Sequence, residues 1–267
     1  MIAIHDWFDY DFPPKERIKL IRQAGFDAVL LWWGDEFDNS SYLEYPDYAR
    51  RLGLSIDSAH LPFDSCNDIW LDSLNGEGLT EMYAKRLEDA AICGVPALVM
   101  HLSRGSEPPP PNPLGLERMK RLTWLAEEKC VRIAVENLKK PEYPPYILDR
   151  IQSPGLGLCF DAGHQNCRTP EVDWLSLYGS RLAALHLHDN GGFISGAGEE
   201  DQHRLPFDGT VGWPATMRKI AGTGYKGAVA LEVTNKGYED KSAEKFLAIA
   251  FERAKRLESL TAAPHEG

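Results

Sequence analysis

Several features that would assign this sequence of 267 residues to a common protein class are missing. No stretch of about 18 consecutive apolar residues occurs, so no membrane-spanning helix is expected. The first residues, MIAIHDWFDYDF, have neither the basic start nor the long apolar segment of a secretory signal peptide. The five cysteines never form a CxxC pair, and four of them lie in or beside apolar runs, as reduced buried thiols do. These absences together predict a cytoplasmic protein.

Positive charge is scarce as well. The chain has 29 lysines and arginines against 40 aspartates and glutamates, which gives a formal net charge of −11. An acidic chain repels polyanions, so nucleic acids and anionic membrane surfaces are disfavoured as partners. The rest of the composition, 43% hydrophobic and 26% charged, is ordinary for a globular protein and sufficient for one large core.

One pattern repeats along the chain: an amphipathic helical segment, a glycine, and then a short apolar run. Residues 15–24 have helical spacing, Gly25 ends the segment, and residues 28–33 (AVLLWW) form a buried strand pattern. Eight such apolar runs occur, and residues 242–257 supply a closing helix. Apolar strands that alternate with helices indicate a parallel sheet covered on its outer side. Eight units in about 250 residues predict a (β/α)₈ TIM barrel.

An open doubly wound sheet is the alternative fold. It normally has fewer units or a second domain, and no glycine-rich dinucleotide fingerprint follows the first apolar run. No linker divides the chain, because the proline-rich residues 106–113 fall between a strand and its helix. Residues 1–267 are therefore expected to form one domain, with the proline-rich loop on the top face of the barrel.

The ends of the apolar runs carry the polar residues. In a barrel of this kind the chemistry lies at the carboxyl ends of the strands. Seven of the eight runs end in a residue that can bind a metal or carry a proton, as the whole set shows: His5, Trp33, His60, His101, Glu136, Asp161, His186 and Glu232. A single carboxylate at such a place is more often a helix N-cap, and a single histidine is as often a satisfied core residue.

At four of these ends a metal site is favoured over a cap or a core residue. In the predicted barrel one small volume receives the side chains of Glu136, Asp161, His186 and Glu232. Three like charges there would lose hydration and repel one another, and a divalent cation removes the conflict. Three carboxylates and one imidazole suit one Mn²⁺, Mg²⁺ or Co²⁺ ion, with Zn²⁺ as a further choice. Glu136 and Glu232, on opposite sides of the barrel axis, are then placed to remove and return a proton beside a metal-polarised carbonyl.

A second set of polar residues lies in the glycine-containing segment 186–212. Asp189-Asn190-Gly191 is a turn signal in its own right. Asp201, His203 and Arg204 either stay exposed or turn inward, and in the second case Arg204 is the best candidate to bind a substrate hydroxyl, carboxylate or phosphate. Aromatic residues near the early strand ends either line a sugar pocket or pack in the core: Trp7, Trp32, Trp33, Phe63 and Trp70.

These residues also carry a family resemblance that covers nearly the whole chain. The motifs AVENL, LCFDAGH, LHLHDN, DQHRLPFDG and ALEVTN resemble those of the xylose isomerase-like TIM-barrel superfamily, which includes sugar isomerases, sugar epimerases and the apurinic endonuclease IV. The resemblance implies that Glu136, Asp161, His186 and Glu232 bind the metal, with His186 favoured over His188. Other matched positions are implied to bind substrate or further metal: His60, His101, His164, Asp201 and His203.

One motif departs from the family pattern. Where the family has Gly-Glu-Gly, this chain has Phe207-Asp208-Gly209. The aspartate is a shorter acid and the first glycine is missing, so the role of the family's glutamate does not transfer to Asp208. A different path of the loop is expected as well.

The resemblance and the residues together predict a metal-dependent isomerase or epimerase of a sugar, a sugar phosphate or a related polyhydroxy carbonyl compound. Three alternatives use the same residues: an endonuclease IV-like zinc phosphodiesterase, a keto-cyclitol dehydratase, and a barrel that binds a sugar without catalysis. The expected partner is a small sugar-like molecule, and a homodimer is expected only by analogy with other barrels.

Overall fold

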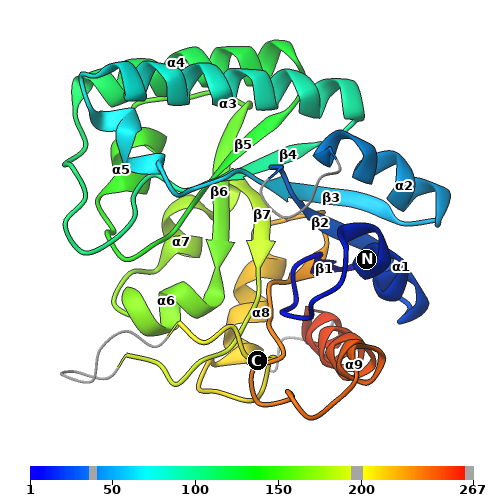
Figure 1. The fold of residues 1–267 in the computed structure, drawn as a ribbon. Helices are drawn as coiled ribbons and strands as arrows, with labels where there is room; N and C mark the ends of the chain where they lie inside the picture. The colour runs from blue at the N-terminus through cyan, green and yellow to red at the C-terminus, as the bar shows by residue number, and fades with distance from the viewer. Residues whose placement is uncertain (36–40, 194–200, 262–267) are drawn as a thin grey trace.

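Eight parallel strands form the centre of the molecule in the computed structural model, which describes residues 1–35, 41–193 and 201–261 (Figure 1). Each strand begins where an apolar run of the sequence begins, to within a residue or two. The strands are β1 (Ile2–His5), β2 (Ala28–Trp32), β3 (Ser55–His60), β4 (Ala97–Met100), β5 (Arg132–Glu136), β6 (Leu156–Asp161), β7 (Leu182–His186) and β8 (Val229–Leu231).

The strands close into a barrel. They pair in the order β7-β6-β5-β4-β3-β2-β1-β8. A parallel bridge between Leu187 and Leu231 joins the two ends of this order. In that bridge the Leu187 amide donates to the Ala230 carbonyl over 3.0 Å, and the Glu232 amide donates to the Leu187 carbonyl over 3.3 Å. The predicted (β/α)₈ barrel is confirmed, and the open doubly wound sheet is wrong.

Helices cover the outside of the barrel (Figure 1). They are α1 (Pro14–Gln23), α2 (Tyr45–Arg51), α3 (Leu74–Cys93), α4 (Pro113–Glu128), α5 (Tyr143–Leu148), α6 (Ala162–Arg168), α7 (Trp174–Tyr178), α8 (Trp213–Gly222) and α9 (Ala243–Thr261), with short 3₁₀ turns η1 (Tyr42–Glu44), η2 (Cys66–Trp70) and η3 (Gly179–Arg181). Each long helix turns an apolar face inward, as Ile18, Leu20 and Ile21 of α1 do. The predicted closing helix continues four residues further than expected, to Thr261, with Glu258 bound to the Met1 amino group at 2.8 Å.

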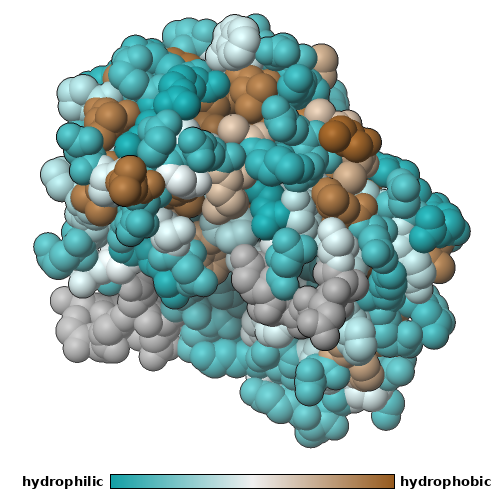
Figure 2. Space-filling model, turned by 45° about the horizontal axis from the view of Figure 1, so that its top comes forward, coloured by the Kyte–Doolittle hydropathy of each residue, from teal (hydrophilic) through white to brown (hydrophobic). Residues whose placement is uncertain are grey.

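The proline-rich residues 106–112 connect β4 to α4, as predicted, and Asn112 caps α4 by accepting a hydrogen bond from the Gly115 amide over 3.0 Å. Figure 2 shows one face of the molecule, on which apolar side chains form separate small patches among hydrophilic residues. Within the three described ranges, none of the helices is long and apolar enough to cross a membrane. The assignment of residues 1–267 to one domain and the cytoplasmic location stay predictions; residues 262–267 lie outside the described part.

Candidate metal centre

The structure brings the four predicted metal ligands together. Glu136, Asp161 and His186 are the last residues of β5, β6 and β7, and Glu232 follows β8 directly. One ligand atom from each lies within 4.8 Å of those of the other three. Glu136, Asp161 and His186 are almost completely buried, and the side chain of Glu232 is 17% exposed. Four side chains from four strands thus meet in one volume near the barrel axis.

The strands leave room for these side chains because the next layer of the barrel is small. Side chains alternate along a strand, so the residue two positions before a ligand lies one layer deeper on the same face. Two positions before His101, Glu136, Asp161 and His186 come Val99, Ala134, Cys159 and Ala184. These four residues form a small buried cluster of their own. They make the apolar floor on which the polar layer rests.

Asp161 fits both roles that its place in the sequence allows, the N-cap of a helix and a metal ligand. Its Oδ1 atom accepts a hydrogen bond from the His164 amide over 2.7 Å and so caps α6. Its Oδ2 atom is buried and has no hydrogen bond in the described structure. One oxygen therefore serves the helix while the other is left for a different partner.

Buried polar atoms without a good hydrogen bond are concentrated at this end of the barrel. Among the described residues they include Glu136 Oε1, both ring nitrogens of His186 and His188, and Asp201 Oδ1. Their neighbours are close, since His186 Nδ1 lies 2.9 Å from Glu232 Oε2, but the directions do not suit hydrogen bonds. Native proteins pair nearly all buried polar atoms, and an ion is a common explanation for the exceptions. Nitrogen and carboxylate atoms in this arrangement fit a divalent metal.

Burial and charge compete at the carboxylates. Burial raises the pKa of Glu136, but the neighbouring His186 and His101 outweigh it and hold that pKa well below its usual value. Glu232 behaves in the same way, with burial opposed mainly by His186, and its pKa also lies well below the usual value. Burial lowers the pKa of His186, whereas Cys159 and the two glutamates raise it well above the usual value. The ionised carboxylates need positive charge beside them, which a divalent cation supplies as well as a protonated histidine does.

A second group of possible ligands adjoins the first: His164, His188, Asp201 and His203 also have ligand atoms within 4.8 Å of one another. Asp201 Oδ2 lies 3.2 Å from Nε2 of both His164 and His203, and the His188 and His203 rings stack at 4.0 Å. Asp161 Oδ1 lies 3.1 Å from His188 Nε2 and so links the two groups. His164, Asp201 and His203 were predicted to face the site. His188 was the disfavoured alternative to His186, although two residues of spacing put both on one face of the chain.

The backbone of His203 is held in an unusual conformation. Its φ of +44° lies in the left-handed region, which costs an L-residue about 1–2 kcal/mol. Two hydrogen bonds fix it there: the Thr234 amide donates to the His203 carbonyl over 2.9 Å, and His203 Nδ1 lies 2.9 Å from the Glu232 carbonyl. Residues 194–200 of the same predicted glycine-containing loop lie outside the described residues.

The predicted residues His60 and His101 form a third group with Glu136. The two Nε2 atoms lie 3.3 Å apart, and Glu136 Oε2 lies 3.1 Å from His101 and 3.5 Å from His60. Burial lowers the pKa of His101, although Glu136 opposes this. Glu136 therefore belongs to two groups of ligand atoms at once.

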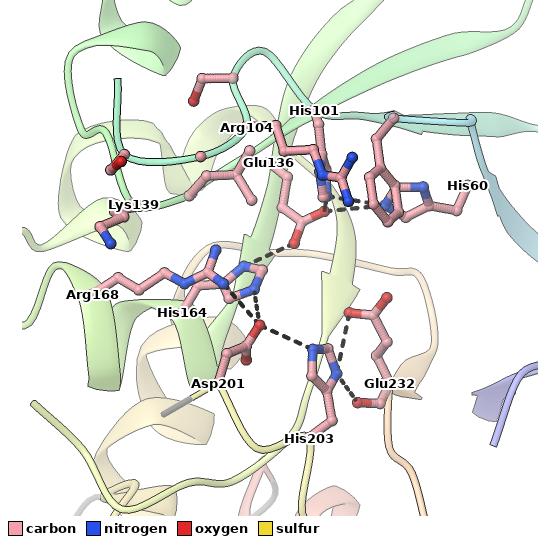
Figure 3. Close-up of a pocket in the computed structure, with 15 residues that line it drawn as sticks. His60, His101, Arg104, Glu136, Lys139, His164, Arg168, Asp201, His203 and Glu232 are labelled. Atoms are coloured by element: carbon pink, nitrogen blue, oxygen red, sulfur yellow. Dashed lines mark hydrogen bonds and ion pairs between the residues drawn. The ribbon is translucent and has the colours of Figure 1, made fainter. Parts of the chain in front are cut away.

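Members of all three groups line one cavity of about 490 Å³, shown in Figure 3. It is lined by His60, Phe63, His101, Ser103, Arg104, Gly105, Ser106, Glu136, Leu138, Lys139, His164, Arg168, Asp201, His203 and Glu232. This volume is within the range of small-molecule sites. Of the predicted aromatic residues, Phe63 lines the cavity and Trp32 stacks on His60 at 5.9 Å, whereas Trp33 and Trp70 are buried in the core.

Arg204, the predicted substrate-binding arginine, is not among these lining residues in the described structure. Its backbone pairs with Asp189 through two hydrogen bonds of 2.9 Å. Arg168 lines the cavity instead, and its Nη2 atom donates to Asp201 Oδ2 over 2.8 Å (Figure 3). The sequence held a signal for it, because Arg168 follows His164 by four residues and so lies on the same face of a helix.

Asp189 fixes the loop that carries the second group. Its Oδ1 atom accepts hydrogen bonds from the Asn190 and Val211 amides, both at 3.0 Å. Its Oδ2 atom accepts from the Phe207 amide at 2.9 Å and from Trp213 Nε1 at 2.8 Å. Asp189, which the sequence marks as a turn, therefore joins the start of the β7–α8 connection to residues 207–213.

The residues Phe207-Asp208-Gly209, which replace the family's Gly-Glu-Gly motif, each have a distinct environment in the loop. Phe207 adopts a φ of +75°, where a glycine would be unstrained. Asp208 lies outside the cavity lining and accepts a hydrogen bond from Arg253 over 2.9 Å. Gly209 is required by space, because a Cβ atom there would lie 2.2 Å from the Asn190 carbonyl oxygen. The shorter acid thus ties the loop to α9 and faces away from the site.

Comparisons with known proteins agree with this architecture. A family model described as "Xylose isomerase-like TIM barrel" matches residues 18–255. The uncharacterized protein y4fM of Sinorhizobium fredii is 28% identical in an alignment of 299 positions, which covers 96% of this chain and 92% of that protein. A solved D-tagatose 3-epimerase-like protein is 20% identical with a TM-score of 0.76 over 98% of both chains. D-psicose 3-epimerase from Clostridium cellulolyticum H10, solved with D-tagatose, is 15% identical with a TM-score of 0.75 over 97% of both chains.

Proposed function

The chain belongs to the xylose isomerase-like TIM-barrel family, and from this premise we propose that it is a divalent-metal-dependent isomerase or epimerase of a sugar or a related polyhydroxy carbonyl compound. The observation that carries the proposal is the meeting of Glu136, Asp161, His186 and Glu232 within 4.8 Å at the base of the cavity. The solved D-tagatose 3-epimerase-like protein and the solved D-psicose 3-epimerase, which share the fold at 20% and 15% identity, support this choice of reaction.

Glu136, Asp161, His186 and Glu232 would hold the metal. The unpaired buried atoms of Glu136, Asp161 and His186, and the mixture of carboxylate and imidazole, suit Mn²⁺, Mg²⁺, Co²⁺ or Zn²⁺. The metal, when bound, supplies Lewis-acid polarisation of a substrate carbonyl oxygen. The apolar floor beneath the site excludes water from one side, which strengthens the electrostatic interactions there.

Glu136 and Glu232 are the proposed acid/base pair. They come from β5 and from the residue after β8, and Figure 3 shows them on two sides of the cavity. Both pKa values lie well below the usual value, so both carboxylates are ionised at neutral pH, the form in which a carboxylate can accept a proton. One glutamate would remove a proton from the carbon beside the carbonyl, and the other, after taking up a proton from solvent, would deliver it to the opposite face or to the adjacent carbon. The first glutamate then releases its proton to solvent, which completes the cycle.

The other cavity residues would position the substrate. His60 and His101 line the cavity beside Glu136, and His164 and His203 line it beside Asp201. Each imidazole offers a donor or an acceptor to a sugar hydroxyl. Arg204, which lies away from the lining, is not part of this proposal.

A second candidate function, a multi-zinc phosphodiesterase, is favoured by one observation. Glu136 is shared by two groups of ligand atoms, and the group around Asp201 adjoins them, so the cavity has ligand atoms for more than one ion. Two or more zinc ions can hold the attacking and leaving oxygens of a phosphoester. The net charge of −11 disfavours a nucleic-acid substrate, which leaves this candidate second.

The test is metal content, measured by plasma mass spectrometry on protein purified without an affinity tag or chelator. About one Mn, Mg, Co or Zn per chain supports the isomerase, and two or three zincs per chain support the phosphodiesterase. Asp161→Asn is the sharpest variant, because an asparagine still caps α6 through its oxygen but no longer offers a charged ligand. It should lose the metal and keep the fold, whereas the exposed-acid control Asp149→Asn should keep both. Metal-free wild-type protein that shows no thermal shift with Mn²⁺ or Zn²⁺ would remove the basis of both candidates.

Product analysis separates the remaining alternatives. An epimerase exchanges the proton beside the carbonyl with solvent deuterium without loss of water, whereas a keto-cyclitol dehydratase releases water. A barrel that only binds a sugar shows ligand-induced thermal stabilisation in wild type and in Glu136→Gln and Glu232→Gln alike, with turnover in none of them.

A further inference from the structure

One buried side-chain amide lies between two of the proposed metal ligands. Asn137 directly follows Glu136, the last residue of β5, and it is completely buried. Its Nδ2 atom donates to the Asp161 carbonyl oxygen over 2.8 Å, and its Oδ1 atom accepts from the Asp161 amide over 2.8 Å. The side chain of one residue thus binds both main-chain polar groups of a ligand on the next strand.

These two hydrogen bonds extend the sheet beyond the point where the main chains of β5 and β6 stop pairing. The last residue pair of the two strands is Glu136 and Cys159, and Asp161 lies two residues farther along β6. An asparagine side chain offers a carbonyl oxygen and an N–H group, as a peptide unit does. The Asn137 amide therefore takes the place of a peptide unit of β5 opposite Asp161.

The main-chain carbonyl of Asn137 has a different neighbour. His164 Nδ1 lies 3.2 Å from that carbonyl oxygen and 3.0 Å from Glu136 Oε1. Because the side chain pairs with Asp161, the main-chain carbonyl can turn toward the His164 imidazole, which lines the cavity. Asn137 thus contacts a proposed ligand with its side chain and a cavity residue with its backbone.

Asp161 is held on both of its sides. On the β7 side its register partner is His186, which is another proposed ligand. On the β5 side it is held by Asn137, the sequence neighbour of Glu136. The His164 amide also fixes the Asp161 Oδ1 atom, over 2.7 Å. The place of Asp161 relative to Glu136 and His186 is therefore set by hydrogen bonds within the protein, before any metal binds.

We propose that Asn137 is a positioning residue of the metal centre: its amide sets the place of Asp161 relative to Glu136, and so determines how tightly the ligands hold the metal. Residues that orient a metal ligand without touching the metal typically change metal affinity by about 10–100-fold. A ligand that is already in place also loses less conformational freedom when the metal binds. The assignment rests on the proposed function, and it adds a residue that belongs neither to the four ligands nor to the cavity lining of the described structure.

The test is a titration of metal-free protein with Co²⁺ in competition with a chelator, followed by visible absorption. Asn137→Ala should weaken Co²⁺ binding by about 10–100-fold and change the cobalt spectrum, because Asp161 loses its fixed place among the ligands. Asn112→Ala is the matched control, since the Asn112 amide also donates to one backbone carbonyl, that of Trp70, and accepts from one backbone amide, that of Gly115. The control should lower Tm through loss of the α4 cap and leave the Co²⁺ affinity and spectrum unchanged. A lower Tm in Asn137→Ala, with wild-type Co²⁺ affinity and spectrum, would reduce Asn137 to a structural residue and overturn the proposal.

A measurement on the wild type keeps the proposal testable even if Asn137→Ala does not fold. Hydrogen exchange is followed at the Asp161 amide in metal-free protein. This amide should exchange as slowly as the paired amides within β6, because Asn137 already holds it. Fast exchange that becomes slow only when Co²⁺ is added would show that the metal places Asp161, and the positioning role would be wrong.

The positioning role and the proposed function fail in different ways. Metal binding that Asn137→Ala weakens, in a wild-type protein that converts no sugar, leaves Asn137 assigned and rejects the isomerase. Sugar conversion by the wild type, together with an unchanged Co²⁺ affinity in Asn137→Ala, rejects the positioning role and leaves the isomerase. Wild-type protein that binds no Co²⁺ rejects both.

Discussion

The two ends of the barrel contain cavities of equal size and different chemistry. The cavity at the carboxyl ends of the strands and one at their amino ends each have a volume of about 490 Å³. The first is lined by His60, His101, His164 and His203 together with three carboxylates. Among the described residues, no histidine lines the second cavity, and Asp57 is its one lining carboxylate. Volume alone therefore does not distinguish a site from a gap between strands.

Hydrogen bonding separates the two ends more clearly. At the amino end, Asp57 Oδ1 accepts from the Ala228 amide over 3.1 Å, and Arg132 donates to the carbonyls of Leu182 and Arg181 over 3.1 and 3.0 Å. Those side chains hold strand ends together. At the carboxyl end, carboxylates and imidazoles face one another with ligand atoms left over. In barrels of this kind polar residues at the amino end serve stability and those at the carboxyl end serve chemistry.

The largest expected difference between the two ends is in turnover. Glu136→Gln and Glu232→Gln should each lower kcat by about 10²–10⁴-fold, because an amide cannot accept the substrate proton. Asp57→Asn, the corresponding change at the amino end, should leave kcat unchanged. Steady-state kinetics on the ketose that the wild type converts, at saturating metal, decides between these outcomes. A glutamine variant with wild-type kcat contradicts the assigned acid/base pair.

Metal affinity at the carboxyl end of the barrel should depend on pH. In the metal-free protein the pKa of His186 is raised well above its usual value, so a metal must displace its proton. The pKa values of Glu136 and Glu232 lie well below the usual value, so these carboxylates have no proton to release at neutral pH. Affinity should therefore fall as pH falls, by about tenfold per unit for the one proton displaced. Competition with a fluorescent chelator between pH 6 and 8 measures the slope, and a flat profile would show that His186 does not bind the metal.

The sequence predicts the barrel and its strand-end residues more fully than it predicts the loops. The alternation of apolar runs and helices predicts the barrel because an open doubly wound sheet normally has fewer units or a second domain, and in a barrel the strand-end residues fall at one rim. Glu136, Asp161, His186 and Glu232 meet because the ends of parallel strands meet. The loops are harder: Asp189 bonds to Phe207, Val211 and Trp213, about 20 residues later in the chain, and no local pattern encodes those contacts.

Two residues that the sequence analysis did not select for the site, His188 and Arg168, could have been found from simple periodicity. His188 shares a face with His186 by strand spacing, and Arg168 shares a face with His164 by helical spacing. Arg204 was placed in the site because of its charge, although its side chain is not part of the cavity lining in the described structure. Spacing within one element was thus a better guide here than residue type within a loop.

Removing the metal from the carboxyl end should lower the free energy of unfolding. At a free metal concentration of about 100 times Kd, binding adds about 2.7 kcal/mol to the free energy of unfolding. For a domain of this size that corresponds to a rise in Tm of roughly 5–10 °C over the chelator-treated protein. Asp161→Asn should show no such rise, whereas Asp57→Asn should show the wild-type rise. Scanning calorimetry with and without chelator tests this, and equal Tm values for wild type in both conditions would contradict a bound metal.

The smallest effect concerns two residues with left-handed backbone, one at each end of the barrel. His203 has a φ of +44° at the carboxyl end, and the exposed Cys130 has a φ of +55° in the turn between α4 and β5, at the amino end. Glycine adopts this conformation without strain. Cys130→Gly should therefore stabilise the fold by about 0.5–1 kcal/mol, after the extra freedom of the unfolded chain is subtracted.

The control for that change is Cys130→Ala, which removes the thiol and keeps the strain, and should leave Tm unchanged. His203→Gly relieves the same kind of strain but removes an imidazole from the cavity. It should therefore raise Tm while it weakens substrate binding. Thermal unfolding combined with kinetics measures both. If Cys130→Gly lowered turnover as much as His203→Gly, strain at the amino end would be coupled to the site, and the division of the barrel into a stabilising end and a chemical end would be wrong.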